Sequence, residues 1–563
     1  MKKRLCAALL AALMCAGILP MLVSAADETK TDTWDGTADT GWYNETETEF
    51  HLKTAEQLAG LAQLVNARGN GNTFEGKTIY LENDLDLSGH IWESIGTGSN
   101  HANYFAGTFD GQYHVIHRLT NTQVHINHAL FGTVVRGTVR NLGIADAHIA
   151  ATENSSTIRM GLLAEWALNA TFKNCFTTGS LTGSTNSGAF LGGLIGEAMA
   201  GTQIIGCYSS AVIESKAIEY PEAVGGLVGA WETPGNAPMI ADSYFDGKIL
   251  FSGGGTAQTG MSTNVGGILG MCFDNVTNLL IQNCMVATET VQAPSDIDIE
   301  KGNGGMWLAW YYLGVPENCY WPVDDREWPA SIEFTKLIET GDPEQFLHFD
   351  CGTPTSDFKA DSVLQGLKAK AQADVTWVAG FEHPTFAWDL RNIPADYTAV
   401  DTAKGKVPAD LSQYTPNTAE ALKQALELVA SGKSKAEQNA VDAMAKAIED
   451  AVGALQFKPA DYSRVDAAIA EAQALNKDAY TDFSAVDAAV RAVVRGKNIT
   501  EQNAVDAMAK AIEDAVGALE KKPADIPQTG DPGSTSFWFI LLLVSAVAAG
   551  GILTTVNGRR AKQ

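Results

Sequence analysis

The sequence predicts a multidomain protein: a right-handed parallel β-helix (a β-solenoid), then two small three-helix bundles, then a C-terminal transmembrane segment. Two internal repeats and one apolar run carry this prediction. Gly-rich apolar segments recur at spacings of 32, 33 and 41 residues, a helical stretch occurs twice without change, and a mostly apolar run occupies residues 537–556. The repeats differ in kind, so they divide the chain into two regions of different architecture.

The first repeat lies between about residues 128 and 320. Its copies are Gly192–Gly196 (GGLIG), Gly225–Gly229 (GGLVG) and Gly266–Gly270 (GGILG), with a looser copy at Met160–Ala164. Short apolar strands with Gly and Asn at fixed turns, repeated at this period, are typical of stacked coils that bury one shared core. A β-propeller is the alternative, although its blades need longer antiparallel strands.

Cysteine follows Asn or Gly at one recurring place in this repeat. The cysteines at this place are Cys175, Cys207, Cys284 and Cys319, and two more, Cys272 and Cys351, lie before residue 392. None forms a Cys-x-x-Cys pair, so we predict no metal site from them. A recurring position favours stacked, free and buried thiols, with disulfide bridges as the alternative.

Residues on both sides of the repeat extend the pattern. Thr54 is a plausible N-cap, with Gln57 at the third helical position, of a short helix that ends near Asn66. With the repeats themselves, this region resembles the GLUG repeat of bacterial surface proteins. The resemblance covers about residues 34 to 390. It implies that the helix covers the first coil, and that a segment containing Trp377 and His383–Trp388 closes the domain, which we place at 27–392.

The second repeat is helical. Glu437–Leu455 reads EQNAVDAMAKAIEDAVGAL, and Glu501–Leu519 is identical. Apolar residues follow one stripe of this segment, as in an amphipathic helix. Further helices are predicted at about 396–407, 418–431, 461–474 and 484–495, which gives bundles at 393–460 and 461–524. The bundles resemble FIVAR domains of Gram-positive surface proteins, which implies a stalk; ligand binding by the bundles is the alternative.

The two termini carry export signals. Lys2, Lys3 and Arg4 precede an apolar stretch that ends in small residues, as in a signal peptide spanning 1–26. At the other end, a pentapeptide precedes the apolar run 537–556 and a basic tail with Arg559 and Arg560. That pentapeptide consists of Ile526, Pro527, Gln528, Thr529 and Gly530.

This order resembles the LPxTG-type sorting signal of Gram-positive surface proteins, with Ile526 in place of the usual Leu and the whole signal at 526–563. The resemblance implies that a sortase cleaves after Thr529 and joins the chain to peptidoglycan. It also implies that the protein is secreted, exposed on the cell wall, and in contact with the membrane only through its C-terminal helix before sorting. An ordinary membrane anchor is the alternative.

The charge balance excludes one class of partner. The chain has 66 acidic against 39 basic residues, a formal net charge of -27. A phosphate backbone needs a basic surface, so we expect no binding to nucleic acid. No nucleophile elbow, His-Glu-x-x-His or P-loop motif is present, and we predict neither a cofactor nor a metal.

Two glutamates are weak candidates for catalysis. Glu165 and Glu197 each follow a copy of the Gly-rich repeat. If one repeat is one coil, stacking brings their backbones to about 4.8 Å, and two carboxyl groups about 5 Å apart are typical of a retaining glycosidase. Trp166 and Trp231 lie beside this column and could stack on a sugar. Two solvated carboxylates without a catalytic role are the simpler interpretation.

A second candidate site is aromatic and is a possible glycan-binding groove. Ring stacking together with carboxylate hydrogen bonds is typical of carbohydrate binding, although core packing is the competing interpretation and is favoured for Tyr320. The candidate residues are Trp307, Trp310, Tyr311, Trp321, Asp324, Asp325 and Trp328, with Tyr312 between them.

Three functions fit these patterns. The first is a non-enzymatic surface protein whose solenoid binds an extracellular glycan or protein for adhesion. The alternative is a surface-anchored glycoside hydrolase or polysaccharide lyase on the same β-helix, and the third is a purely structural wall component. Fold alone does not separate them.

Overall fold

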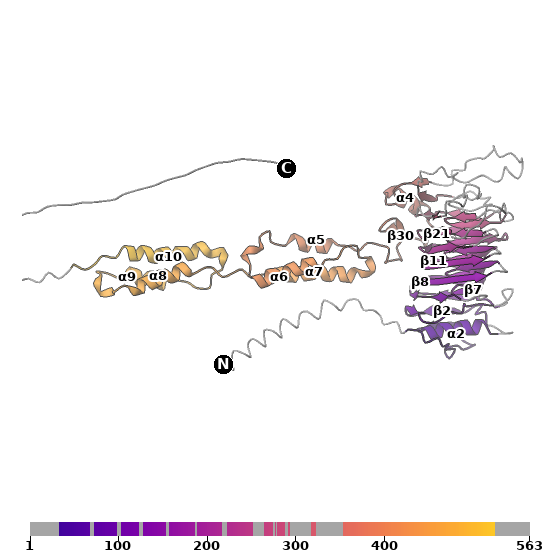
Figure 1. Cartoon of the computed structure of the whole chain (residues 1–563), viewed down its shortest axis with the longest axis horizontal. Coiled ribbons are helices and arrows are strands. Elements are labelled where there is room, and N and C mark those ends of the chain that lie inside the picture. The colour runs from indigo at the N-terminus through magenta and orange to yellow at the C-terminus, as the bar shows by residue number, and fades with distance from the viewer. Residues whose placement is uncertain are drawn as a thin grey trace, which may run out of the picture. The chain divides into compact units, whose positions relative to one another are not determined.

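The computed structural model describes most of the chain between residues 33 and 523 (Figure 1). The described ranges are 33–67, 72–97, 103–122, 128–153, 157–185, 188–216, 222–251, 264–273, 276, 278–287, 291–292, 317–322 and 353–523. They separate into two compact units, one of residues 33–408 with 420–454 and the other of 409–419 with 455–523. The predicted signal peptide and sorting signal lie outside the described residues.

The N-terminal part is a parallel β-solenoid, as predicted, and its largest sheet in the described residues has 19 strands. These are β1 (Glu49–Leu52), β2 (Thr78–Leu81), β3 (Leu85–Asp86), β4 (Thr108–Asp110), β5 (Val115–His117), β6 (Thr120–Asn121), β8 (Thr138–Glu153), β11 (Thr171–Thr185), β14 (Gln203–Ile205), β15 (Tyr208–Ser209), β16 (Val212–Ser215), β19 (Met239–Ala241), β20 (Tyr244–Phe245), β21 (Lys248–Phe251), β24 (Leu280–Gln282), β25 (Met285–Val286), β26 (Val291–Gln292), β27 (Tyr320–Pro322) and β28 (Thr353–Thr355).

Two further parallel sheets complete the coils. One contains β7 (Phe131–Val135), β10 (Ala164–Leu168), β13 (Ile195–Met199), β18 (Val228–Glu232) and β23 (Leu269–Cys272). The other contains β9 (Ile158–Gly161), β12 (Ala189–Gly192), β17 (Glu222–Gly225) and β22 (Asn264–Gly266). Each strand pairs with the equivalent strand of the next coil, so residues at equivalent positions form columns along the solenoid.

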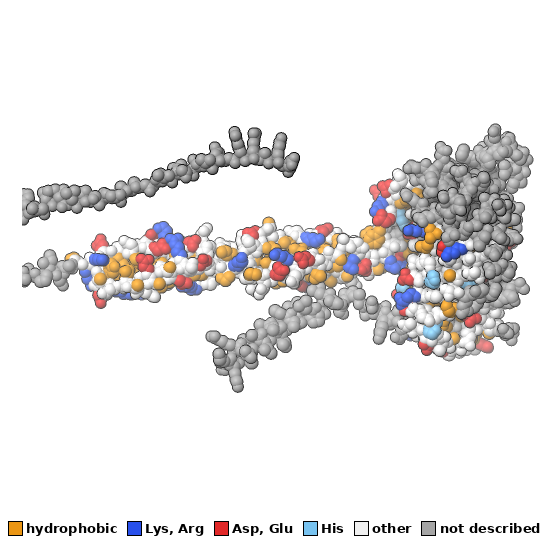
Figure 2. Space-filling model, in the orientation of Figure 1, with side chains coloured by type: hydrophobic (Ala, Val, Ile, Leu, Met, Phe, Trp, Pro, Cys, Tyr) orange, Lys and Arg blue, Asp and Glu red, His pale blue; other side chains and the backbone are white. Residues whose placement is uncertain are grey.

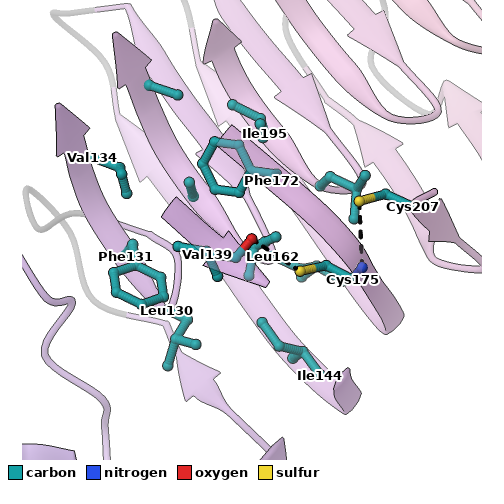
Figure 3. Close-up of a cluster of buried hydrophobic side chains, with 14 of the residues drawn as sticks. Leu130, Phe131, Val134, Val139, Ile144, Leu162, Phe172, Cys175, Ile195 and Cys207 are labelled. Carbon is teal, nitrogen blue, oxygen red and sulfur yellow. Dashed lines mark hydrogen bonds between the residues drawn. The ribbon is translucent and has the colours of Figure 1, made fainter. Parts of the chain in front are cut away.

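The core consists of such columns. One of them joins Ile79, Phe109, Val139, Phe172, Ile204, Ile240 and Ile281, and every member is fully buried. Figure 3 shows part of this core, in which Val139 and Phe172 lie inside the coils. Burying each large apolar side chain contributes about 1.5–3 kcal/mol, so every coil is stabilised chiefly by the coils beside it.

Helix α2 (Ala55–Val65) covers the first coils with one apolar face. Leu58, Leu61 and Val65 on that face are buried. The Thr54 hydroxyl accepts a hydrogen bond from the Gln57 amide at 3.4 Å, so the predicted N-cap is confirmed. The Gln57 side chain accepts from the Lys53 amide at 2.8 Å, one residue before the N-cap.

A column of left-handed residues explains why Asn or Gly precedes the recurring cysteine. Its members are Asn141, Asn174, Gly206, Asp242, Asn283 and Asn318, with φ between 47° and 65°. Asn, Asp and Gly tolerate this conformation better than other residues do. The asparagines also bond between coils, since Asn174 donates to Asn141 at 3.1 Å.

The five described cysteines are free and buried, as predicted. Figure 3 shows Cys175 and Cys207 at equivalent places in successive coils. Burial raises the pKa of the Cys175 thiol well above its usual value, and Cys284 behaves in the same way. These thiols therefore act as small apolar groups of the core.

Residues 361–392, which we call the strap, cover one flank of the solenoid. The strap contains α4 (Asp361–Lys370) and the antiparallel pair β29 (Trp377–Ala379) and β30 (Pro384–Phe386). It packs on a column of mostly aromatic side chains that point out of the large sheet: Phe176, Tyr208, Tyr244, Met285 and Tyr320.

Buried carboxylates hold the strap in place. Asp242 accepts hydrogen bonds from the Trp377 indole and the Gln372 amide, both at 2.9 Å. From the strap side, Asp389 accepts a bond from the Tyr208 hydroxyl at 2.5 Å. The segment that resembled a closing element therefore seals an aromatic column on the side of the coils.

The C-terminal part is helical, and its helices lie close to the predicted ranges. They are α5 (Thr398–Gly405), α6 (Pro416–Glu427), α7 (Gln438–Gly453), α8 (Ser463–Ala474), α9 (Ser484–Arg491) and α10 (Gln502–Gly517), with 3-10 turns at Leu411–Gln413, Lys435–Glu437, Lys477–Ala479 and Ile499–Glu501. Val465, Val486 and Val505, one from each of α8, α9 and α10, share one buried cluster. Within the described ranges, no helix is long and apolar enough to cross a membrane.

Candidate functional site: a carboxyl cluster beside the glycine-rich corner

The Gly-rich repeat forms a sharp corner between the two smaller sheets. At this corner the stacked residues Leu162, Leu194 and Leu227 point into the core and are fully buried. A Cβ atom at Gly192 would lie 1.9 Å from the Ile195 carbonyl oxygen, and one at Gly225 would lie 1.8 Å from that of Val228. No side chain fits there, so the corner itself requires the repeated glycines.

The register at this corner differs from the expected one by one residue. Ala164 lies opposite Ile195, and Trp166, not Glu165, lies opposite Glu197. Farther along the coil the sequence separation between paired residues changes, and Thr171 lies opposite Gln203. The cause is that the turn after β13 holds one more residue than the turn after β10. The expected stacking of Glu165 on Glu197 is therefore wrong, since the two occupy different columns.

Glu165 and the two tryptophans predicted beside the pair do not form an open site with Glu197. Glu165 accepts a hydrogen bond from the His128 amide at 3.3 Å. Trp231 is fully buried in the solenoid core, whereas Trp166 is half-buried. Trp231 therefore offers no ring face to a sugar.

Glu197 is instead the centre of a buried polar cluster. Its side chain points out of β13, yet only 1% of the residue is exposed. Arg159 on β9 donates from Nε to Glu197 Oε2, and its guanidinium lies 5.5 Å from the centre of the Phe190 ring. The second oxygen, Oε1, is buried and has no hydrogen-bond partner among the described residues.

Glu232, on the neighbouring strand β18, is a second carboxyl group that acts on Glu197. It follows by two residues the position opposite Glu197, which is Ala230. The pKa of Glu197 is raised to about 7, chiefly by burial and next by its interaction with the Glu232 carboxyl, while Arg159 opposes both effects. A proton on Glu197 removes the repulsion between the two carboxyl groups.

The cluster holds a weak acid near neutral pH, but it holds that acid out of reach. Small apolar side chains, Ala223 and Ala230, and the rings of Phe190 and Phe273 surround it. Arg159 is the more exposed partner, with 31% of its side chain accessible. A substrate would contact Glu197 only if Arg159 moved aside, so in this arrangement the cluster joins three successive coils.

Sequence reasoning missed Arg159 and Glu232 as members of this site. The signal was present, because both lie on strands that flank copies of the Gly-rich repeat. The neighbours follow from a register that depends on the length of each turn, and repeat spacing alone does not give that length.

The aromatic candidates are only partly within the described residues. Trp307, Trp310, Tyr311, Asp324, Asp325 and Trp328 lie outside them. Trp321 is 6% exposed and packs in the main core, and Tyr320 is 7% exposed beneath the strap. These two rings therefore support the core, in line with the competing interpretation for Tyr320.

The predicted sorting pentapeptide and the question of a metal site complete the comparison with the sequence. Ile526, Pro527, Gln528, Thr529 and Gly530 lie outside the described residues. Among the residues that are described, no group of three or more His, Cys, Asp or Glu side chains is arranged to hold a metal ion.

Comparisons with known proteins give one structural likeness. No protein-family model matches the chain, and no curated protein matches it. Among solved structures, the chain is similar to a Bacteroides ovatus protein provisionally described as an immunoglobulin A1 protease. The likeness has a TM-score of 0.43 at 18% sequence identity, and it covers 61% of this chain and 93% of the other.

Proposed function

We propose that this chain is a cell-wall-anchored surface protein whose β-solenoid binds an extracellular glycan or protein for adhesion. Its partners would be sortase and peptidoglycan at the C-terminus and an extracellular ligand at the solenoid. In this proposal the solenoid is right-handed and GLUG-like, and the helical units are FIVAR-like and form the stalk. The signals at 1–26 and 526–563 support the location.

One observation favours binding over catalysis. Glu197, the described carboxyl whose pKa is about 7, is 1% exposed and covered by Arg159. A general acid must reach its substrate at hydrogen-bond distance. Because this acid is sealed, the described part of the solenoid is better suited to presenting a surface than to cleaving a bond.

Binding is tested with the chain spanning residues 27–525 on a glycan array and on a panel of polysaccharides. We expect retention of one glycan class without release of shorter products. Products that disappear in Glu197→Gln would refute the adhesin proposal. Absence of any response on both panels, with the same result on immobilised extracellular matrix proteins, would refute ligand binding of these classes.

Anchoring is tested separately, in a Gram-positive host with a sortase. The full chain should appear in the peptidoglycan-linked fraction, released only by a wall hydrolase. Thr529→Ala removes the residue at which cleavage is expected, so that variant should shift to the membrane and medium fractions. Equal wall attachment of both chains would contradict the sorting signal and leave the binding result untouched.

A surface-anchored glycoside hydrolase or polysaccharide lyase is the second candidate. The observation in its favour is the carboxyl pair Glu197 and Glu232, in which one group has a pKa of about 7. Such a pair supplies an acid and a base when a substrate displaces its cover. In that case Glu197→Gln should lower kcat by at least about a hundredfold, whereas Glu165→Gln should have little effect.

A further inference from the structure

The third helix of each helical unit is conserved between the two units more closely than packing requires. Helices α7 and α10 have the same sequence, QNAVDAMAKAIEDAVG. The helices beside them have diverged: α5 reads TAVDTAKG, and the first eight residues of α8 read SRVDAAIA. A recent duplication of the whole unit would have kept all three helices alike. The identity is therefore specific to one helix.

The identity between α7 and α10 includes residues that are exposed to solvent. In α7 the buried residues are Val441, Ala445 and Ile448, and core packing is enough to explain why they recur in α10. The opposite side of α7 carries exposed residues at spacings of three and four, which place them on one straight stripe. This stripe consists of Asn439, Ala443, Lys446, Asp450 and Gly453, and its counterpart on α10 consists of Asn503, Ala507, Lys510, Asp514 and Gly517, all exposed.

The stripe is complementary to itself. A twofold axis opposite Ile448 would bring Lys446 of one helix against Asp450 of an antiparallel second copy, and Asp450 against Lys446. The same axis brings Ala443 against Gly453, two small residues that let helix backbones approach closely. Such an isologous arrangement satisfies both charges with one surface.

We propose that this stripe is a homotypic docking surface, which pairs antiparallel with the same stripe on a second copy of the chain. Each chain carries the surface twice, once in each helical unit, so weak single contacts gain strength when two form together. Figure 2 shows acidic and basic side chains interspersed along both helical units. A surface that carries both charges can pair with a second copy of itself.

The charges on the stripe are available for exchange. Lys446 lies 2.9 Å from Asp450 in its own helix, and Lys510 lies 2.8 Å from Asp514. These side chains are mostly exposed, and exposed pairs of this kind contribute little to stability, so exchanging partners costs little. Glu449, at the edge of the stripe, is paired with Lys406 at 2.7 Å, which limits repulsion between two copies.

Charge reversal tests the pairing by sedimentation velocity on the chain spanning residues 27–525. We expect a concentration-dependent dimer for the unaltered chain. Lys446→Asp with Lys510→Asp should weaken the dimer by at least about tenfold in Kd, because like charges then face each other. Asp450→Lys with Asp514→Lys should weaken it equally. An equimolar mixture of the two variants should recover the dimer, since opposite charges meet again.

Controls separate this surface from general charge effects. Lys423→Asp with Lys477→Asp makes the same change of net charge at exposed lysines away from the stripe and should leave the dimer unchanged. Circular dichroism of every variant checks that the helices remain folded. A monomer at all concentrations, equal dimerisation of all variants, or no recovery in the mixture would each overturn the proposal.

Discussion

In the solenoid, a residue packs mainly against equivalent residues of the coils on either side. In the helical units, a residue is stabilised by its own helix and by the two helices packed beside it. Gly225 and Gly405 show the difference. A Cβ at Gly225 would meet a backbone oxygen at 1.8 Å, but a Cβ at Gly405, the last residue of α5, would meet nothing within 4 Å. Stacking of the coils therefore requires Gly225, whereas Gly405 only lowers the local stability of its helix.

Two spectroscopic signals separate the regions experimentally. Residues 393–524 contain no tryptophan, whereas tryptophans are spread through the solenoid region. Tryptophan fluorescence therefore follows the solenoid, and far-ultraviolet circular dichroism at the helix band follows mainly the helical units. Both signals are measured on the chain spanning residues 27–525.

The largest effect is expected at the glycine corner. Gly225→Val forces a branched side chain against the Val228 backbone and should cost at least about 5 kcal/mol, enough to lose the fluorescence transition. Gly405→Ala should instead stabilise the helices by up to about 1 kcal/mol. The comparison would fail if both substitutions changed stability by similar amounts in chemical denaturation.

The next effect is expected at the strap. Phe386 is fully buried against Tyr244 and Trp377, with ring centres 5.4 Å and 4.5 Å away. Phe386→Ala should cost about 3–5 kcal/mol and increase amide exchange over residues 377–392. Leu390→Ala, an exposed neighbour, serves as the control. Unchanged protection in the strap would contradict its role as a packed cover.

A smaller effect is expected from pH, with opposite signs in the two regions. The pKa of Glu197 is raised to about 7 in the folded solenoid, so the folded state binds this proton more tightly than the unfolded state does. Its stabilising contribution is full below about pH 4.5 and is lost as pH rises to about 7, up to about 3 kcal/mol in total. In Glu197→Gln, the free energy of unfolding measured by fluorescence should no longer fall over this pH range.

The helical carboxylates should behave in the opposite way. Lys433 lowers the pKa of Glu437, Lys497 lowers that of Glu501, and Arg464 lowers that of Glu513. Their contribution is present above the ordinary glutamate pKa and is lost on acidification. Denaturation between pH 4 and pH 8 checks both signs, and parallel slopes in the two signals would contradict the assignment.

The smallest effect is expected at a helix start. Ser434 and Glu437 form a capping box before α7, and Asn498 and Glu501 form the equivalent one before α10. Ser434→Ala should cost about 1 kcal/mol in the helical signal and leave the fluorescence transition in place. Lys435→Ala, at an exposed residue of the same turn, keeps the Ser434 and Glu437 side chains and is the control.

The sequence was most informative where local patterns decide the structure. The capped helix from Thr54 and the identical helices from Glu437 and Glu501 follow from short-range spacing, and the structure confirms them. Stacked coils also follow from the glycine spacing, because no side chain fits at Gly192 or Gly225.

Contacts between coils were harder to predict. The cluster of Arg159, Glu197 and Glu232 depends on how many residues each turn contains, and β10 and β13 are offset by 31 residues, not by the 32 of the expected column. The strap depends on tertiary packing: nothing local to Tyr208 indicates that Asp389 will bind it. Errors of register therefore concentrate at the candidate site, where distant segments meet.

The direction of the strap has a mechanical consequence. Beyond α4 the strap reaches back to earlier coils: Gln372 contacts Asp242, Trp388 stacks on Tyr113, and Asp389 contacts Tyr208. Tension applied to the chain after residue 392 would reach Asn392 first, whose side chain donates to the Tyr208 and Tyr244 hydroxyls, and only then Asp389. Because these contacts are made by side chains that point out of the large sheet, breaking them in turn would free the strap and leave the pairing between coils in place.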